Sequence, residues 1–153
     1  MMQTRRDMLT RSASVAAALA GLGLLPQAAL ANWSQAAFEA KTMADLMKAL
    51  GTSGPAESKE VTITGPDIAE NGAVVPVGAS TTLAGAKRIA LLVEKNPAML
   101  AAIFDITEAV EPNISTRVKM GQSSNVYAVA MMGDGKVLFA QKEIKVTLGG
   151  CGG

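Results

Sequence analysis

Apolar and polar residues alternate along much of the second half of the chain. In residues 142–148, Ile144, Val146 and Leu148 are apolar and alternate with the polar Glu143, Lys145 and Thr147. A period of two is typical of a strand with one buried face. Alternation, or a continuous apolar run of strand length, recurs in six more segments, which are residues 61–63, 73–77, 88–94, 101–106, 114–120 and 126–132. The last strand is expected to span residues 136–148, so the pattern predicts about seven short strands.

Turn-forming residues separate these segments. Three turn signals break the strand pattern, namely Gly65-Pro66, Glu70-Asn71-Gly72 and Asn96-Pro97. Gly133-Asp134-Gly135 is expected to join the last two strands as a hairpin. Pro76 cannot donate a backbone hydrogen bond, which favours an edge strand or a bulge at that position. Short strands separated by turns predict a mainly β fold, an antiparallel β-sandwich of immunoglobulin-like type.

A helix is predicted before the first strand, from about Ser34 to Leu50. Ser34 is a suitable N-cap, and Gly51 follows directly after the last helical residue. The apolar stripe of this helix consists of Phe38, Leu46, Met47 and Leu50, with alanines between them. Residues 52–58 are expected to form a loop because a glycine and a proline break regular structure there. One later segment, residues 99–104, fits a helix as well as a strand when it is taken alone.

The N-terminal residues have the pattern of an export signal. Residues 4–10 (TRRDMLT) resemble the twin-arginine motif through Arg5 and Arg6. The apolar stretch that follows, residues 13–25, is too short and too rich in alanine and glycine for a membrane span. Ala29-Leu30-Ala31 then fits a cleavage site. The alternative, an uncleaved amphipathic helix, does not account for this order of basic, apolar and cleavage segments.

This signal divides the chain into three parts. We expect residues 1–31 to be cleaved after export by the twin-arginine route. Their removal takes away three arginines and one aspartate, so the mature chain carries 11 of the 14 Lys/Arg, 12 of the 13 Asp/Glu and a net charge of −1. Residues 32–148 fit one domain, and residues 149–153 are expected to form a separate arm. A nearly neutral domain gives no support to nucleic-acid binding or membrane-surface binding.

The histidine and cysteine counts exclude several kinds of chemistry. The chain has no histidine and one cysteine. Without histidine, the chain cannot form a Ser-His-Asp or Cys-His catalytic group or a histidine-ligated metal site by itself. A single cysteine excludes an internal disulfide and a thiolate metal cluster. These exclusions agree with a non-catalytic protein that has no metal site and no bound cofactor.

The chain ends in Gly149-Gly150-Cys151-Gly152-Gly153, which includes its only cysteine. Glycine has no Cβ, so this segment has no preferred conformation and stays slim. In extended form, Cys151 lies on the order of 10 Å beyond Leu148. The segment is therefore predicted to be a flexible arm with a thiol near its tip, able to enter a channel too narrow for branched side chains.

The thiol of Cys151 has no activating group in the tail. The nearest cation in the sequence is Lys145, so the thiol is expected to be mostly protonated at neutral pH. Activating groups would have to belong to another protein. Three functions remain open at this point: an incidental or homodimerising cysteine, a ubiquitin-like carrier that uses the Gly152-Gly153 carboxylate, and a carrier that loads its cargo on the thiol.

Two other sets of residues could be metal ligands, but a structural role accounts better for each of them. Asp105, Glu108 and Glu111 lie close in sequence, yet they lack the spacing of an oxygen-ligand loop and are expected to be solvated. The mature methionines are scattered through apolar segments, which favours core filling over copper binding. They are Met43, Met47, Met99, Met120, Met131 and Met132.

Two sequence blocks resemble one known family. They are residues 68–77 (IAENGAVVPV) and the terminal Gly-Gly-Cys-Gly-Gly, behind a twin-arginine signal. Together they make the whole mature chain similar to the SoxY family. The members of this family are the sulfur-carrier subunits of the periplasmic sulfur-oxidising (Sox) system. The resemblance therefore implies an exported, periplasmic protein.

The resemblance also implies a function and partners. The cysteine that matches Cys151 would carry the intermediates of thiosulfate oxidation as covalent sulfur adducts, in a heterodimer with SoxZ. SoxAX, a c-type cytochrome pair, would couple thiosulfate oxidatively to it. SoxB, a manganese-dependent hydrolase, would release the terminal sulfone as sulfate. In some organisms SoxCD, a molybdenum- and haem-containing dehydrogenase, would oxidise the remaining sulfane sulfur.

An unactivated thiol on a slim arm agrees with such a carrier, because the enzymes that it visits supply the catalytic groups. A ubiquitin-like carrier needs adenylation by ATP, which is not expected outside the cytoplasm, and it gives no role to Cys151. The main alternative is an exported structural module that dimerises through a Cys151 disulfide. An enzyme that uses Cys151 with a partner's base ranks third.

Overall fold

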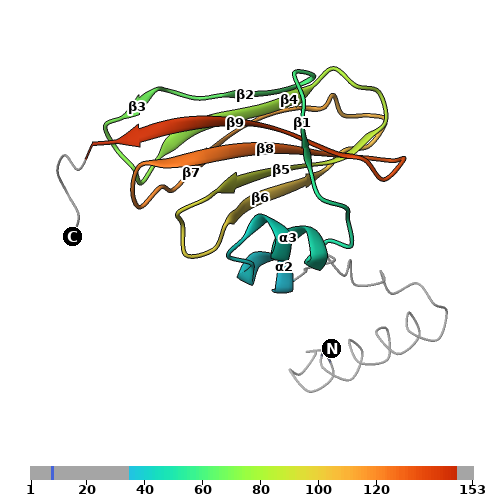
Figure 1. Ribbon diagram of the computed structural model, residues 1–153, viewed down its shortest axis with the longest axis horizontal. Helices are drawn as coiled ribbons and strands as arrows, with labels where there is room; N and C mark the ends of the chain where they lie inside the picture. The colour runs from blue at the N-terminus through green and yellow to red at the C-terminus, as the bar shows by residue number, and fades with distance from the viewer. Residues whose placement is uncertain (1–7, 9–34, 148–153) are drawn as a thin grey trace, which may run out of the picture. The chain divides into compact units, whose positions relative to one another are not determined.

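The computed structural model describes Met8 and residues 35–147 (Figure 1). The described residues form two short helices, α2 Gln35–Glu39 and α3 Met43–Ala49, before the strands begin. No helix among them is long and apolar enough to cross a membrane. The strands are β1 Ala56–Glu57, β2 Val61–Thr64, β3 Ile68–Ala69, β4 Val75–Thr81, β5 Ala86–Val93, β6 Leu100–Asp105, β7 Asn113–Val118, β8 Ser124–Met132 and β9 Val137–Val146.

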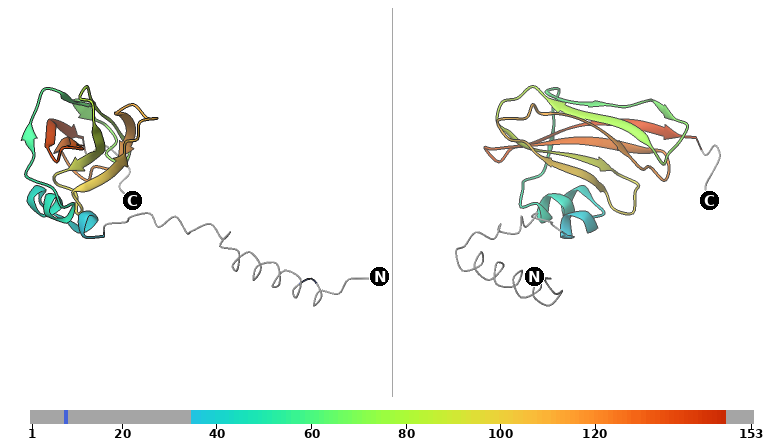
Figure 2. Two further views of the ribbon diagram at one scale, coloured as in Figure 1. Left: turned by 90° about the vertical axis from the view of Figure 1, so that its right-hand side faces the viewer. Right: turned by 180° about the vertical axis from the view of Figure 1, so that it is seen from behind.

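The strands form two sheets, as the sequence predicts. The larger sheet has the order β1-β9-β8-β5-β6, with β3 also on the free edge of β9, and the smaller sheet has the order β2-β4-β7. All pairs among the longer strands are antiparallel, whereas the two-residue strands β1 and β3 pair with β9 in parallel. The view along the strands in Figure 2 shows the sheets around a common core, with the helices outside it. The fold is a mainly β, immunoglobulin-like sandwich.

The main core lies between the two sheets. In β5, Ile89, Leu91 and Val93 point into the sandwich and are at most 2% exposed. Alternate residues of the other strands complete the same cluster, among them Val75, Val77, Val126, Ala128 and Ile144. Burial of these side chains supplies the main driving force for pairing the sheets, because each buried aliphatic side chain contributes about 1.5–3 kcal/mol.

A second apolar cluster lies on the other face of the larger sheet, beneath the helices. Ala90 and Leu92 of β5 belong to it together with Leu46 and Met47 of α3. Figure 1 shows the helices beside β5 and β6. Both faces of β5 are therefore buried, which explains why residues 88–94 form a nearly continuous apolar run instead of alternating.

The prediction of a single helix from Ser34 to Leu50 is wrong, because α2 and α3 are separated at residues 40–42. Thr42 has extended backbone (φ −126°, ψ 156°), and its Oγ1 accepts a hydrogen bond from the N–H of Asp45 at 3.1 Å. Such an N-cap satisfies one of the first free amides of α3, so the second helix starts anew there. Ser34, the predicted cap, lies outside the described residues.

The C-terminal end of α3 agrees with the prediction. Gly51 has a φ of 68°, and its N–H donates to the Lys48 carbonyl at 3.1 Å. The N–H of Thr52 donates to the Met47 carbonyl at 2.9 Å. These two bonds make a Schellman motif, whose left-handed residue is favourable for glycine.

The seven predicted strands are all present, as β2 and β4 to β9. The segment at residues 99–104, which also fits a helix, contributes to strand β6. The pattern does not predict β1, which lies inside the loop expected at residues 52–58, or β3. A two-residue strand is too short to show a hydrophobic period, so its pairing leaves no sequence signal.

Pro76 lies in β4, the central strand of the smaller sheet, and not in an edge strand. However, β2 pairs with β4 only from Gly78 to Thr81. At Pro76 the strand therefore has β7 as its single neighbour, with Arg117 opposite. A proline is tolerated there because one side of the strand is unpaired, as it is in an edge strand.

Candidate functional site

The residues predicted to take part in function lie outside the described residues. Cys151 and its glycine neighbours follow Thr147, the last described residue, and Arg5 and Arg6 belong to the N-terminal segment. The structure does describe the place from which the arm starts. It is the C-terminal end of β9, which lies next to β3 in Figure 1.

The last residues before the arm no longer pair with β8. The ladder between β8 and β9 ends at Ser124 and Ile144, and the Ile144 side chain is fully buried. We call residues 145–147 the arm root. On one side of the arm root, the N–H of Val146 donates to Oγ of Ser123 at 2.9 Å, and this hydroxyl donates to the Val146 carbonyl at 3.5 Å. A single side chain thus replaces the β8 backbone there.

On its other side, the arm root pairs with β3. The N–H of Lys145 donates to the Asp67 carbonyl at 2.9 Å, and the N–H of Thr147 donates to the Ala69 carbonyl at 3.1 Å. Successive amides of the arm root therefore point to opposite neighbours, as in an interior strand. This pairing continues the sheet up to the residue from which the arm begins.

One lysine fastens β3 and the preceding loop to β9. Nζ of Lys142 donates to the Gly65 carbonyl at 2.7 Å and lies 2.8 Å from Oδ1 of Asp67. The hydrogen bond from Lys142, together with its positive charge, lowers the pKa of the Asp67 carboxyl. The Lys142 side chain is 31% exposed, so its bond to the carbonyl is partly shielded from water. We call residues 65–72 the strap.

The far end of the strap approaches β9 too closely for any side chain. A Cβ on Gly72 would lie 2.4 Å from the Met120 carbonyl oxygen and 2.8 Å from Cγ1 of Val146. The Gly72 carbonyl in turn accepts the N–H of Met120 at 2.7 Å. Oδ1 of Asn71 accepts the N–H of Ala73 at 2.9 Å, which closes the predicted turn. Glycine is needed at this position because the backbones themselves are in contact.

Residues 68–77, which resemble the SoxY family, include most of the strap and the start of β4. Their buried members, such as Ala69 and Val75, belong to the sandwich core. Ile68 and Val74, in contrast, are large apolar residues with 57% and 50% exposure. The block therefore packs against the core, pairs with the arm root and presents apolar surface at the same end of the molecule.

The other residues considered as metal ligands have structural partners or solvent around them. Asp105 makes an ion pair with Arg88 at 2.7 Å, and Glu108 and Glu111 are exposed. Within the described part of the chain, no group of three or more acidic, cysteine or histidine residues could hold a metal ion. Four methionines are buried in the apolar clusters, which confirms core filling for them, namely Met47, Met99, Met120 and Met131.

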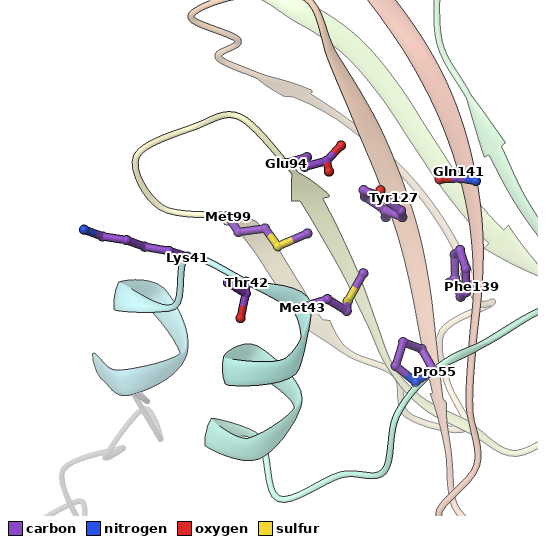
Figure 3. A pocket seen from close by; sticks show the side chains of 9 residues that line it. All are labelled: Lys41, Thr42, Met43, Pro55, Glu94, Met99, Tyr127, Phe139 and Gln141. Atoms are coloured by element: carbon purple, nitrogen blue, oxygen red, sulfur yellow. The ribbon is translucent and has the colours of Figure 1, made fainter.

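A separate hollow of about 380 Å³ lies between the start of α3 and the outer face of the larger sheet (Figure 3). Met43 and Met99 point into it, whereas Lys41 points away. Burial, with a smaller contribution from the charge of Glu94, raises the pKa of Tyr127 at its wall. The lining is mostly apolar, with Glu94 and Tyr127 among its polar members.

Sequence reasoning finds some members of the arm root's surroundings and misses others. The turn at Gly72 is visible as a local signal. The contacts of Ser123, Lys142 and Asp67 leave no such local signal. Their partners lie more than twenty residues away in sequence, and the strand after Asp67 has only two residues. No pattern in the sequence connects such partners.

Comparisons with known proteins agree with this arrangement. The family described as "Sulfur oxidation protein SoxY" matches residues 46–151. The structure of the sulfur carrier protein SoxY from Chlorobium limicola f. thiosulfatophilum is 34% identical, with a TM-score of 0.59, over 69% of this chain and 97% of that one. A search among curated proteins finds no match.

More distant structures share the fold alone. A superoxide reductase (neelaredoxin) from Ignicoccus hospitalis is 21% identical, with a TM-score of 0.51, over 57% of this chain and 80% of that one. The family match, in contrast, spans more than half of the chain and includes the strap, the arm root and Cys151. The chain therefore belongs to the SoxY family of sulfur oxidation proteins.

Proposed function

We propose that this protein is a covalent carrier of sulfur intermediates and that Cys151 is its attachment point. Membership of the SoxY family supports this role, and the similar Chlorobium protein is described as a sulfur carrier. One observation carries the proposal. The sandwich is hydrogen-bonded up to Thr147, and the only cysteine follows four residues later between glycines.

The proposed chemistry takes place on the sulfur of Cys151. In the first step this sulfur, as a thiolate, forms an S–S bond with the sulfane sulfur of thiosulfate, and two electrons pass to the cytochrome SoxAX. The product is a cysteine S-thiosulfonate. In the second step SoxB adds water to the terminal sulfone sulfur, which releases sulfate and two protons and leaves a persulfide on Cys151. Where SoxCD is present, it oxidises the remaining sulfane sulfur.

The length of the arm limits how these enzymes reach the thiol. Because Cys151 lies four residues beyond Thr147, its Cα stays within about 14 Å of the arm root. Each enzyme must therefore bring its active site to this end of the sandwich, where Ile68 and Val74 are exposed. SoxZ is the proposed permanent partner, and no nucleic acid or membrane is involved.

We also propose that the protein works in the periplasm after export by the twin-arginine route. Arg5, Arg6 and the cleavage site after Ala31 support this location. Mature protein recovered from the periplasm should begin at Asn32. Replacing both arginines with lysine should keep the precursor, residues 1–153, in the cytoplasm.

A pair of variants tests the carrier role. Cys151→Ser should leave folding and partner binding unchanged and should abolish thiosulfate oxidation by the reconstituted Sox enzymes. Adding Ser53→Cys to this variant places a thiol on an exposed residue outside the arm and should not restore activity. Oxidation that persists in Cys151→Ser would overturn the proposal, and rescue by Ser53→Cys would show that the arm is not needed.

A further inference from the structure

The arm root is held differently from the rest of β9. Up to Ile144 the strand is paired with β8 and buried in the core. Residues 145–147 depend instead on Ser123 and on β3, which has only two residues of its own. A two-residue strand is not stable alone, so its position depends on what fastens it. Burial of Ala69 holds its C-terminal residue, and Lys142 holds the residues just before it through Gly65 and Asp67.

We propose that the strap fixes the point from which the arm starts, and that Lys142 and Asp67 are positioning residues for the transfer of the Cys151 adduct to partner enzymes. This inference rests on the proposed carrier function. Lys142 touches neither substrate nor cysteine in this account. It acts by keeping β3 beside the arm root, so that residues 145–147 stay part of the sheet.

Opening of the strap would change how far the Cys151 thiol can reach from the sandwich. With the strap in place, four residues separate Cys151 from the last fixed residue, Thr147, so its Cα stays within about 14 Å. If the strap opens and the arm root frays back to Ile144, seven residues separate them and the limit becomes about 25 Å. The thiol is then diluted over a larger volume, and three more residues must be ordered each time the arm enters an active site.

This mechanism predicts a specific kinetic effect. Opening the strap should raise the KM of a partner enzyme for the carrier by at least about two- to tenfold, because the thiol is diluted over a larger volume and more residues must be ordered on binding. The kcat should change little, since the tip of the arm in the active site is the same once bound. A general loss of folded protein would lower the active fraction of the sample and would be detected by circular dichroism.

The chain offers a matched control at the opposite end of β9. Lys136 makes an ion pair with Asp134 at 2.9 Å, much as Lys142 does with Asp67. The Lys136 pair joins two residues of one turn, so it fastens no distant segment. Lys142→Met removes a positive charge and an ion pair from β9, and Lys136→Met removes the same from the turn just before it. Only the first should release the arm root.

The test combines amide hydrogen exchange with enzyme kinetics on the full mature chain. In Lys142→Met the amide of Thr147 should exchange about tenfold faster or more, and the KM of the thiosulfate-coupling cytochrome for the carrier should rise. Lys136→Met should change neither, and Lys142→Arg should restore both. If Lys142→Met fails to fold, Asp67→Asn provides the same comparison through an exposed carboxylate.

The outcomes separate this inference from the carrier role. Unchanged exchange at Thr147 would show that the strap does not hold the arm root. Faster exchange with an unchanged KM would show that the start of the arm does not matter for transfer. Either result overturns the inference and leaves the carrier role intact, because that role is tested by Cys151→Ser.

Discussion

The two ends of β9 are fastened in different ways. At its N-terminal end a tight turn holds the strand: the N–H of Lys136 donates to Oδ1 of Asp134 at 3.0 Å, and Gly135 has a φ of 87°. These contacts lie within a short stretch of sequence, and the two-residue strand β1 adds a distant pairing at Leu138 and Phe139. At its C-terminal end the strand is held by the strap and by Ser123, both of which are far away in sequence.

The difference shows what each end must do. The hairpin only reverses the chain, which a local turn does with little help from other segments. The arm root includes Thr147, the last described residue, and its position sets where the predicted arm begins. Fixing it therefore requires partners on both sides, which Ser123 and Ala69 provide for Val146 and Thr147. Four predictions test this comparison, from the largest expected effect to the smallest.

Ile144, next to the arm root, should contribute more to core packing than Leu138, near the hairpin. Ile144 is fully buried, so Ile144→Ala should lower the free energy of unfolding by about 2–5 kcal/mol, measured by urea denaturation. Leu138 lies near the hairpin end of β9 and is half-buried, so Leu138→Ala should cost about 1–2 kcal/mol. Equal losses would show that the two ends are packed equally well.

The close approach of the strap should make Gly72 irreplaceable. Gly72→Ala should lower the free energy of unfolding by about 1–3 kcal/mol, because the new Cβ meets the Met120 backbone. Gly121 is the control, since a Cβ built on it meets nothing within 4 Å. Gly121→Ala should change stability by less than about 0.5 kcal/mol. A Gly72→Ala protein as stable as the control would contradict the contact.

Side-chain hydroxyls should also contribute unequally to the free energy of unfolding at the two ends of β9. Ser123→Ala removes the group that accepts the Val146 amide, and it should cost about 1 kcal/mol. Ser53 donates to the Gly135 carbonyl at 3.4 Å on an exposed surface, so Ser53→Ala should cost at most a few tenths of a kcal/mol. The amide of Val146 should exchange faster in Ser123→Ala only.

The smallest effect concerns pH. The pKa of Asp67 is lowered by Lys142, so its ion pair stabilises the folded protein above the ordinary aspartate pKa, and this contribution is lost as pH falls through the lowered value. The difference in stability between the wild type and Asp67→Asn should therefore shrink below about pH 4. The pKa of Asp134 is likewise lowered, by its hydrogen bond with Lys136. Asp134→Asn should therefore show a similar pH profile of stability but no change in hydrogen exchange at the Thr147 amide. A difference that grows at low pH would contradict the ion pair.

Much of the sandwich can be predicted from the sequence because its signals are local. The seven longer strands follow from alternation or continuous apolar runs, and Gly51 marks the end of α3. The hairpin before β9 follows from Gly133-Asp134-Gly135. The helix break at Thr42 is missed, although Thr42 with Asp45 three residues later is itself a capping signal.

The surroundings of the arm could not be predicted in the same way. Lys142 and Asp67 are 75 residues apart in sequence, and β3 has no period to recognise. The arm itself is recognised from composition, because glycines around a lone cysteine are a local feature. The sequence thus indicates the proposed attachment point, whereas the residues proposed to position it are brought together only by tertiary pairing.

The most direct test of the account is the intact mass of the mature protein purified from cells that are oxidising thiosulfate, measured with and without reductant. Trypsin cleavage after Lys145 places Cys151 in the terminal peptide, residues 146–153, where the adduct can be located. The account predicts masses raised by sulfur atoms or by thiosulfate on that peptide, and reductant should remove them. A terminal peptide found only as free thiol or as a plain disulfide dimer in those cells would contradict it.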